Sequence, residues 1–328
     1  MKHGGNVWEG NTPAQWLDFS ANLRPEGTPS WVMDAMQKAL LNVRYYPEPS
    51  MLHARKGLAA YAGVPEACIL PTAGGAAAID LVLQRARGTV YTEQFTFSEY
   101  AQRAAVYGRA HRIWHGACRN GDTVFLANPN NPTGASMTPD EVLELHRRVC
   151  AQGGELIVDE AFIDFCPERS VRSRVQVGLT VVGSLTKALC IPGVRLGYVC
   201  AVPEVIAELE QRSLPWALGA LATEIAAQLP EHMQELTEDA QRNAQRRKAF
   251  AAQLAGLGAE VCPSMSNFLL VDFHRDMTNA VQHLRAHGIL VRTCTSFGMP
   301  ENVLRLAVKT EAENERLIHE LEAVLHAR

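Results

Sequence analysis

Residues 184–198 read Ser-Leu-Thr-Lys-Ala-Leu-Cys-Ile-Pro-Gly-Val-Arg-Leu-Gly-Tyr, and this stretch carries most of the information about the fold. It combines the amine of Lys187 with the hydroxyls of Ser184 and Thr186 and the fixed positive charge of Arg195. A lysine amine can form a Schiff base with an aldehyde, while hydroxyls and a guanidinium bind phosphate oxygens. We therefore expect a cofactor that carries both an aldehyde and a phosphate, namely pyridoxal 5'-phosphate (PLP).

Size and composition are those of an ordinary globular protein. The chain has 328 residues, which is long for one core, so we expect two domains. A formal charge of -4 favours neither nucleic acid nor an anionic membrane as a partner. No apolar run approaches the ~20 residues that cross a bilayer, and the N-terminus lacks the apolar region of a signal peptide, so we expect a cytoplasmic protein. The eight cysteines are scattered, and we expect no metal site.

Between about residue 65 and residue 200, short β-branched runs alternate with helical stretches. This alternation predicts an α/β fold whose mixed, mostly parallel sheet is covered by helices, with a ligand site at the carboxyl ends of the strands. The expected strands are 89–92, 112–114, 123–127, 155–159, 179–183 and 196–201, and the expected helices are 76–85, 97–107 and 139–151.

The two ends of the chain predict a smaller α+β domain. The expected elements there are helices over 31–41, 232–254 and up to residue 328, and strands over 267–273, 289–292 and 303–308. We therefore expect a large PLP-binding domain over 45–230, and a small discontinuous domain made of 1–44 and 231–328.

Two segments before the middle of the chain could contact the cofactor. Gly74 and Gly75 precede an expected helix, where glycines let the backbone approach an anion and free N–H groups point outward. An ordinary glycine turn is the alternative. Further on, Phe97 could stack on a planar ring, although a phenylalanine more commonly packs in a core.

Two more segments end expected strands. Residues 128–134 read Asn-Pro-Asn-Asn-Pro-Thr-Gly, a rigid turn in which Asn131 could donate to the cofactor's phenolate oxygen. Asp159 ends the apolar run 156–158, where a buried carboxylate is costly unless it is paired. A pyridinium N–H would pair it and make the ring a better electron sink; a simple cap on the following turn is the alternative.

In combination, NPNNPTG (128–134), DEAF (159–162), SLTK (184–187) and PGVRLGY (192–198) resemble the fold-type I PLP-dependent enzymes. They are most similar to the branch that holds histidinol-phosphate aminotransferase and threonine-phosphate decarboxylase, and the similarity covers nearly the whole chain. The resemblance implies that Lys187 is the Schiff-base lysine, Asp159 the partner of the pyridine nitrogen and Asn131 the partner of the phenolate oxygen.

The same resemblance implies a set of phosphate-binding residues. They would be Gly74, Gly75, Ser184, Thr186 and Arg195. Tyr46 matches a tyrosine that reaches the cofactor phosphate of the neighbouring subunit, so the resemblance also implies a homodimer with a shared active site; a turn aromatic is the alternative.

Within this branch, three local features resemble the decarboxylase: HGGN (3–6) with LDFSAN (17–22), FIDF (162–165) after DEA, and IPG (191–193) after the lysine. They imply decarboxylation of L-threonine O-3-phosphate to (R)-1-amino-2-propanol O-2-phosphate and CO2, for cobalamin biosynthesis. An aminotransferase of the histidinol-phosphate type, a related substrate such as phosphoserine, and a non-catalytic regulator or scaffold are the alternatives.

A phosphorylated amino acid would need anion-binding groups. Arg305 matches the family's carboxylate-binding position, Arg292 could hold the phosphate or the carboxylate, and His3 and Asn22 match positions that resemble phosphate contacts. The chain departs from the family at Arg24, where asparagine is usual. We expect that this additional cation could change which acid fits.

Overall fold

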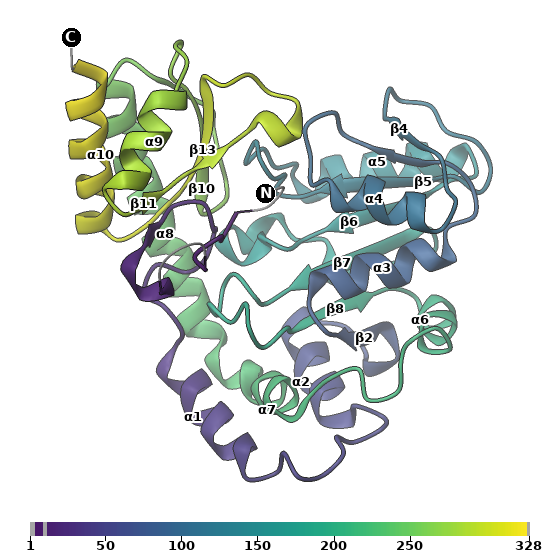
Figure 1. Cartoon of the computed structure of the whole chain (residues 1–328). Helices are drawn as coiled ribbons and strands as arrows, with labels where there is room; N and C mark the ends of the chain where they lie inside the picture. Colours follow the sequence, from purple (N-terminus) through teal and green to yellow (C-terminus); the bar gives the residue numbers. More distant parts are fainter. Residues whose placement is uncertain (1–3, 9–11, 327–328) are drawn as a thin grey trace.

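The structure is a computed structural model that describes residues 4–8 and 12–326. Its large sheet has seven strands within the described residues (Figure 1). In spatial order they are β2 (Ile69–Thr72), β8 (Gly197–Cys200), β7 (Leu179–Ser184), β6 (Glu155–Asp159), β5 (Thr123–Ala127), β3 (Val90–Thr92) and β4 (His111–Ile113). β8 pairs antiparallel with both β2 and β7, and all other pairs of this sheet are parallel. The expected mixed, mostly parallel sheet is therefore confirmed.

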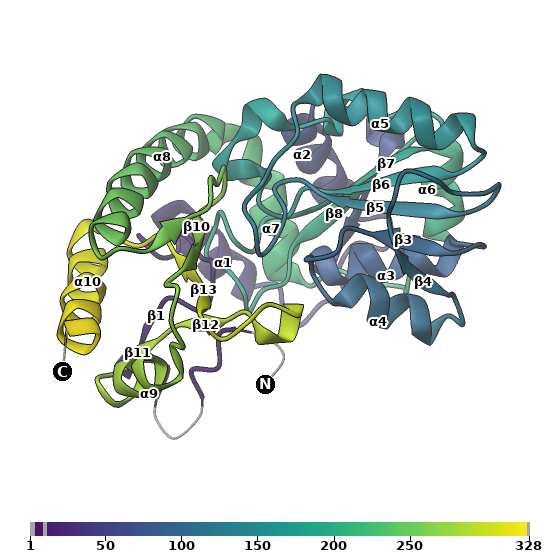
Figure 2. The ribbon, with the colours of Figure 1, turned by 90° about the horizontal axis from the view of Figure 1, so that it is seen from above.

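Helices cover both faces of this sheet, as its apolar strands require. Figure 2 shows α3 (Gly75–Arg85) and α4 (Glu99–Val106) on one face and α5 (Pro139–Ala151) on the other. The start of α5 is fixed locally, because Thr138 and Glu141 form a capping box. The remaining helices of this half are α2 (Leu52–Ala62), α6 (Pro203–Glu210) and α7 (Ala220–Gln228), none of which we expected individually.

A second sheet, of four antiparallel strands, lies beside the long helix α8 (Met233–Gly256). Its strands are β12 (Arg292–Thr293), β13 (Val303–Ala307), β10 (Phe268–Asp272) and β9 (Glu260–Val261), and the helices α9 (Thr278–Ala286) and α10 (Glu311–His326) complete this half. The antiparallel pairing places Arg292 of β12 directly opposite Arg305 of β13.

The single strand expected over 289–292 is wrong, because the chain changes partners within it. β11 (Ile289–Leu290) pairs in parallel with β1 (Leu17–Asp18) of the N-terminal segment, whereas β12 pairs with β13. Backbone hydrogen bonds from Leu17 and Phe19 to the Gly288 and Leu290 carbonyls fix the first pairing. The N-terminal segment is thereby joined to the smaller half of the molecule.

Two hydrophobic cores accompany the two sheets. The larger core surrounds the seven-stranded sheet and includes Trp31 and Val32 of α1 (Ser30–Leu40), while Phe19 belongs to the core beside β10 and β13. The division of the chain into domains at residues 45 and 231 stays a prediction. Within the described residues, no helix combines the length and the apolar composition that crossing a membrane demands.

Candidate active site

An inner cavity opens at the carboxyl ends of β5, β6 and β7, against the N-terminus of α3. Most of the expected cofactor-binding residues line it: Gly75, Phe97, Asn131, Asp159, Ser184, Lys187 and Arg195. Most of them follow or end a strand of the sheet or begin a helix, and Arg195 precedes β8, so the fold brings together residues that are more than 100 positions apart. This is the position expected for the ligand site of such a sheet.

Asp159 is a buried carboxylate that accepts hydrogen bonds from two donors. The Tyr100 hydroxyl donates to Oδ2 over 2.6 Å, and the Ala161 N–H donates to Oδ1 over 2.9 Å. Burial raises the pKa of Asp159, while these two hydrogen bonds and the charge of Lys187 act in the opposite direction. The carboxylate is therefore held in place, but a cation in the cavity would stabilise its charge further.

Lys187 lies in the wall of the same cavity, with cations near its amine. Burial lowers its pKa to about 8, and the charges of Arg195 and Arg305 contribute in the same direction. Burial is the largest of these causes of the lowered pKa. A substantial fraction of the amine is thus neutral, and hence nucleophilic, slightly above neutral pH.

The end of the inner cavity beside α3 has groups that can bind an anion. Gly74 has a φ of +86°, and a Cβ there would lie 2.7 Å from a guanidinium nitrogen of Arg195. A Cβ on Gly75 would approach the Cβ of Ser184 to 3.1 Å. The first N–H groups of α3 have no side-chain cap. They point at the cavity end, where Ser184 and Arg195 also lie.

Three expected cofactor residues, Gly74, Thr186 and Tyr46, do not line the inner cavity, although Gly74 lies next to Arg195, which does. Thr186 does not line it, yet its hydroxyl oxygen is buried and finds no hydrogen-bond partner within the described residues. Tyr46 is 82% exposed, and its ring lies 4.8 Å from that of Trp216. A single subunit therefore does not bring Tyr46 into the cavity that Lys187 lines.

These features fit PLP when they are taken together. The cavity offers an amine of lowered pKa, a fixed carboxylate, an aromatic face in Phe97 and a cationic end with free N–H groups. The partnerless hydroxyl of Thr186 is costly unless a polar ligand uses it, and the lack of a Cβ at Gly74 lets Arg195 lie against the backbone there.

A wider outer cavity of about 710 Å³ adjoins the inner one and shares Phe97, Asn131 and Lys187 with it. The outer cavity adds Asn22, Arg292, Arg305 and Lys309 from the N-terminal segment and the smaller half. Of these, Lys309 was not expected; its position just after β13 is the only sequence signal that could have indicated it.

Arg305 is buried and connects three parts of the chain. Its Nη1 donates to Asn131 Oδ1 over 2.6 Å and its Nη2 to the Ser20 carbonyl over 2.5 Å. Burial lowers the pKa of Arg305 to about 10, and the charge of Arg292 adds to the effect. Arg292 in turn donates to Ser296 Oγ over 2.7 Å. Two buried like charges on adjacent strands form a site that an anion would stabilise.

Of the two expected phosphate contacts near the N-terminus, only Asn22 can be placed. It is 4% exposed, it lines the outer cavity, and its Oδ1 has no hydrogen-bond partner within the described part of the chain. His3 lies outside the described residues. Arg24 does not line the outer cavity; its side chain is directed to α8 instead, and its expected effect on which acid fits stays a prediction.

Outside these cavities, His283, His287 and Glu320 could together offer three metal ligands. This group was not expected; the four-residue spacing of the two histidines is the sequence signal that could have indicated it. Because His283 Nε2 lies 3.2 Å from Glu320 Oε2 on a partly exposed surface, a histidine–carboxylate pair accounts for the arrangement.

A family model, aminotransferase class I and II, matches residues 14–321. Among curated relatives, threonine-phosphate decarboxylase of Salmonella typhimurium is 32% identical, with 98% of this chain and 96% of the relative covered. Histidinol-phosphate aminotransferase of Akkermansia muciniphila is 26% identical, with 96% of this chain and 92% of the relative covered.

Solved structures give the same picture of the fold. The chain superposes on L-threonine-O-3-phosphate decarboxylase from Porphyromonas gingivalis with a TM-score of 0.86 and 27% identity, covering 94% of this chain and 99% of that one. Histidinol-phosphate aminotransferase from Sinorhizobium meliloti, solved in complex with PLP, gives a TM-score of 0.84 at 21% identity, with 94% and 90% covered.

Proposed function

The chain belongs to the aminotransferase class I and II family and uses PLP, and on that premise we propose that it decarboxylates L-threonine O-3-phosphate. The products would be CO2 and (R)-1-amino-2-propanol O-2-phosphate, which serves cobalamin biosynthesis. Two observations support this choice within the family. The decarboxylase is the more similar of the two compared relatives, and the outer cavity offers cations for a substrate with both a carboxylate and a phosphate.

In this proposal, residues around the inner cavity hold the cofactor. Lys187 supplies the amine that binds its aldehyde, and Asp159 accepts the hydrogen bond of its ring nitrogen. Phe97 stacks on the ring, and Asn131 contacts the phenolate oxygen. The phosphate lies among Gly74, Gly75, Ser184, Thr186 and Arg195, at the N-terminus of α3.

When bound, PLP supplies an electron sink for the electron pair that remains on the substrate Cα as the carboxylate leaves. The chain's own residues determine which bond of Cα breaks, because they fix the substrate's orientation. Arg305 and Arg292 would hold the two anionic groups and thereby fix the orientation of the Cα–carboxylate bond. Lys187, whose pKa is about 8, is placed to deliver the proton that replaces CO2 on Cα.

The observation that carries the proposal is the position of two arginines opposite each other on adjacent strands. Arg292 and Arg305 are register partners on β12 and β13 and line the same cavity, which also includes Lys187. A substrate that carries both a phosphate and a carboxylate offers one anionic group to each of the two guanidinium groups. A phosphorylated amino acid satisfies both cations at once.

We further propose that the active site is completed by a homodimer. Large apolar side chains are exposed around the end of α1 and the loop before α7: Leu40, Leu41, Val43, Tyr45, Tyr46, Leu214 and Trp216. Such a patch on a globular protein indicates an interface. Tyr46 in this patch could then reach the cofactor phosphate of the second subunit.

The deciding experiment is an assay of purified PLP-loaded protein with L-threonine O-3-phosphate. We expect CO2 in equal amounts with a phosphorylated primary amine, and slower turnover of phosphoserine and of unphosphorylated threonine. An aminotransferase, supported by the 26% identical relative, would release no CO2 and would form a keto acid once an amino donor is added. Absence of both products would contradict the proposed function.

A further inference from the structure

The segment from Asn22 to Thr28 lies directly against the loop that carries Lys187. The backbone N–H of Arg24 donates to the carbonyl oxygen of Lys187 over 3.0 Å. Four residues on, the Thr28 hydroxyl donates to the Cys190 carbonyl over 2.9 Å. Two positions before Arg24, Asn22 enters the outer cavity. The segment from Asn22 to Thr28 thus contacts both the loop that carries Lys187 and the outer cavity.

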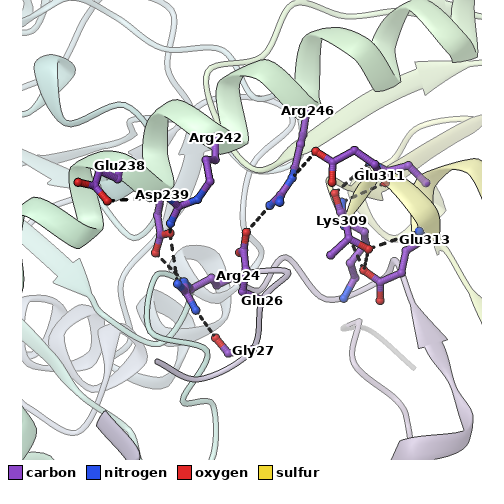
Figure 3. A network of polar contacts seen from close by, with 12 residues as sticks. Arg24, Glu26, Gly27, Glu238, Asp239, Arg242, Arg246, Lys309, Glu311 and Glu313 are labelled. Atoms are coloured by element: carbon purple, nitrogen blue, oxygen red, sulfur yellow. Dashed lines mark hydrogen bonds and ion pairs between the residues drawn. The ribbon is translucent and has the colours of Figure 1, made fainter. Parts of the chain in front are cut away.

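The side chain of Arg24 fastens this segment to helix α8 (Figure 3). Its Nε donates to Asp239 Oδ2 over 2.6 Å and its Nη2 to Asp239 Oδ1 over 3.2 Å, which makes a two-point contact. Nη1 donates to the Gly27 carbonyl over 3.0 Å, and Glu235 lies 3.3 Å away. Arg24 is 8% exposed and Asp239 is equally buried, so solvent screens the pair only weakly.

We propose that Arg24 is a positioning residue: its ion pair with Asp239 holds the Asn22–Arg24 backbone against the carbonyl of Lys187 and thereby fixes both the lysine and Asn22. The inference rests on the proposed function only in taking Lys187 as the residue that binds the cofactor. It gives the arginine at position 24 a role through the backbone rather than through contact with substrate.

Arg246, an arginine of α8, provides a matched control. Arg246 pairs with Glu26 of the same segment and, over 3.0 Å, with Glu311 of α10 (Figure 3). It therefore also ties the segment to the smaller half, but its partner Glu26 makes none of the contacts with the Lys187 loop described above. Substitution of either arginine would lower the overall stability of the protein, whereas only substitution of Arg24 should affect Lys187.

The test compares Arg24→Gln, Asp239→Asn and Arg246→Gln in two measurements. The first is the pH midpoint of the visible absorption band of the PLP-loaded protein. We expect Arg24→Gln and Asp239→Asn to raise this midpoint by about half a unit or more, roughly threefold in the protonation constant. The reason is that a loosened lysine nitrogen becomes less buried and moves away from the charges of Arg195 and Arg305, and both changes favour its protonation. Arg246→Gln should leave the midpoint unchanged.

The second measurement is hydrogen exchange of the cofactor-free protein. The amide at position 24 should lose at least about tenfold in protection in Arg24→Gln and Asp239→Asn, because local opening no longer breaks a buried ion pair. Arg24→Lys, which keeps the charge but not the two-point contact, should fall between wild type and Arg24→Gln in both measurements.

Wild-type midpoints and protection in both Arg24→Gln and Asp239→Asn would overturn the inference, as would equal shifts in Arg246→Gln. Should Arg24→Gln fail to fold, Asp239→Asn and Arg24→Lys decide the question alone. Failure of the premise looks different: Lys187→Ala would then keep the visible band of the wild-type protein, whatever the Arg24 variants do.

Discussion

Tyr100 of α4 donates its hydroxyl hydrogen to Asp159 at the end of β6, over 2.6 Å, and both groups are buried. Burial raises the pKa of Tyr100 well above its ordinary value, and the negative charge of Asp159 acts in the same direction, so the phenol stays the donor. Together with the Ala161 N–H, it fixes the carboxylate that we propose as the partner of the cofactor ring.

Tyr100→Phe should therefore lower kcat. The ring of Tyr100 stacks on Phe125 at 4.9 Å, so phenylalanine preserves the packing and removes only the hydroxyl. A hydrogen bond to a charged group contributes about 1.5–3 kcal/mol, so we expect a loss of roughly 10- to 100-fold. Single-turnover kinetics with L-threonine O-3-phosphate measure it. Tyr107→Phe, which removes a hydroxyl bonded to Asp80 instead, is the control and should leave kcat unchanged.

The lowered pKa of Lys187 predicts a pH profile. Only the neutral amine attacks an aldehyde, so binding of pyridoxal to the cofactor-free protein should accelerate with rising pH and level off above about 8. Arg195→Gln removes a cation that lowers this pKa, and should move the profile to higher pH. Pyridoxal, which has no phosphate, separates this effect from lost phosphate binding. A profile centred near the ordinary lysine value in wild type would contradict the assignment, and Lys187→Ala should show no visible band.

Substrate binding should depend on Arg292 without an effect on the cofactor. Arg292→Gln leaves the inner cavity intact, so the absorption spectrum of bound PLP should not change. KM for L-threonine O-3-phosphate should rise about 30-fold or more, since loss of one partner of a buried charge pair costs ~2–5 kcal/mol. Comparison with unphosphorylated threonine identifies the bound group: if Arg292 holds the phosphate, KM for threonine stays the same.

The exposed apolar patch predicts a dimer that can be disrupted by charge. Wild type should sediment as a dimer, while Leu41→Glu combined with Val43→Glu should shift it toward a monomer that binds PLP more weakly. Val177→Glu is a matched control, because Val177 is as exposed as Leu41 but lies at the amino end of β7. A monomeric wild type with full activity would contradict the shared active site.

Because Glu93 is buried, we expect the unfolding free energy to change between pH 5 and pH 7. Burial raises its pKa from 4.5 to about 7, so in this range the folded state binds the proton more tightly than the unfolded state. The unfolding free energy of the cofactor-free protein should therefore fall as pH rises through the window. In Glu93→Gln this fall should be smaller. Urea unfolding at several pH values measures the difference, and parallel curves would contradict it.

The sequence predicted local features well because they depend on neighbouring residues. The bounds of β5, β6 and α5 follow from apolar runs, turn residues and a capping box within a few positions. The short strand β1 was missed, since two residues carry almost no pattern and it pairs only with β11 across the chain. The change of partner between Leu290 and Arg292 has the same cause.

The residues of the candidate site also fall into those that local sequence predicts and those that only the packing reveals. Lys187, Asp159, Asn131 and Arg195 could be named from motifs, because their chemistry and spacing are written in contiguous segments. Tyr100 and Lys309 could not, because neither stands in a motif and only the packing of α4 and β13 brings them to the cavities.

By itself, then, the sequence determined the type of fold, the cofactor and the residues with the required chemistry. Only the tertiary structure decided where the charges point. Arg305 reaches Asn131 across 174 positions, and Arg24 turns away from the substrate toward Asp239, 215 positions along the chain. Buried charges must find partners, and which partner is within reach depends on how the two halves of the molecule pack.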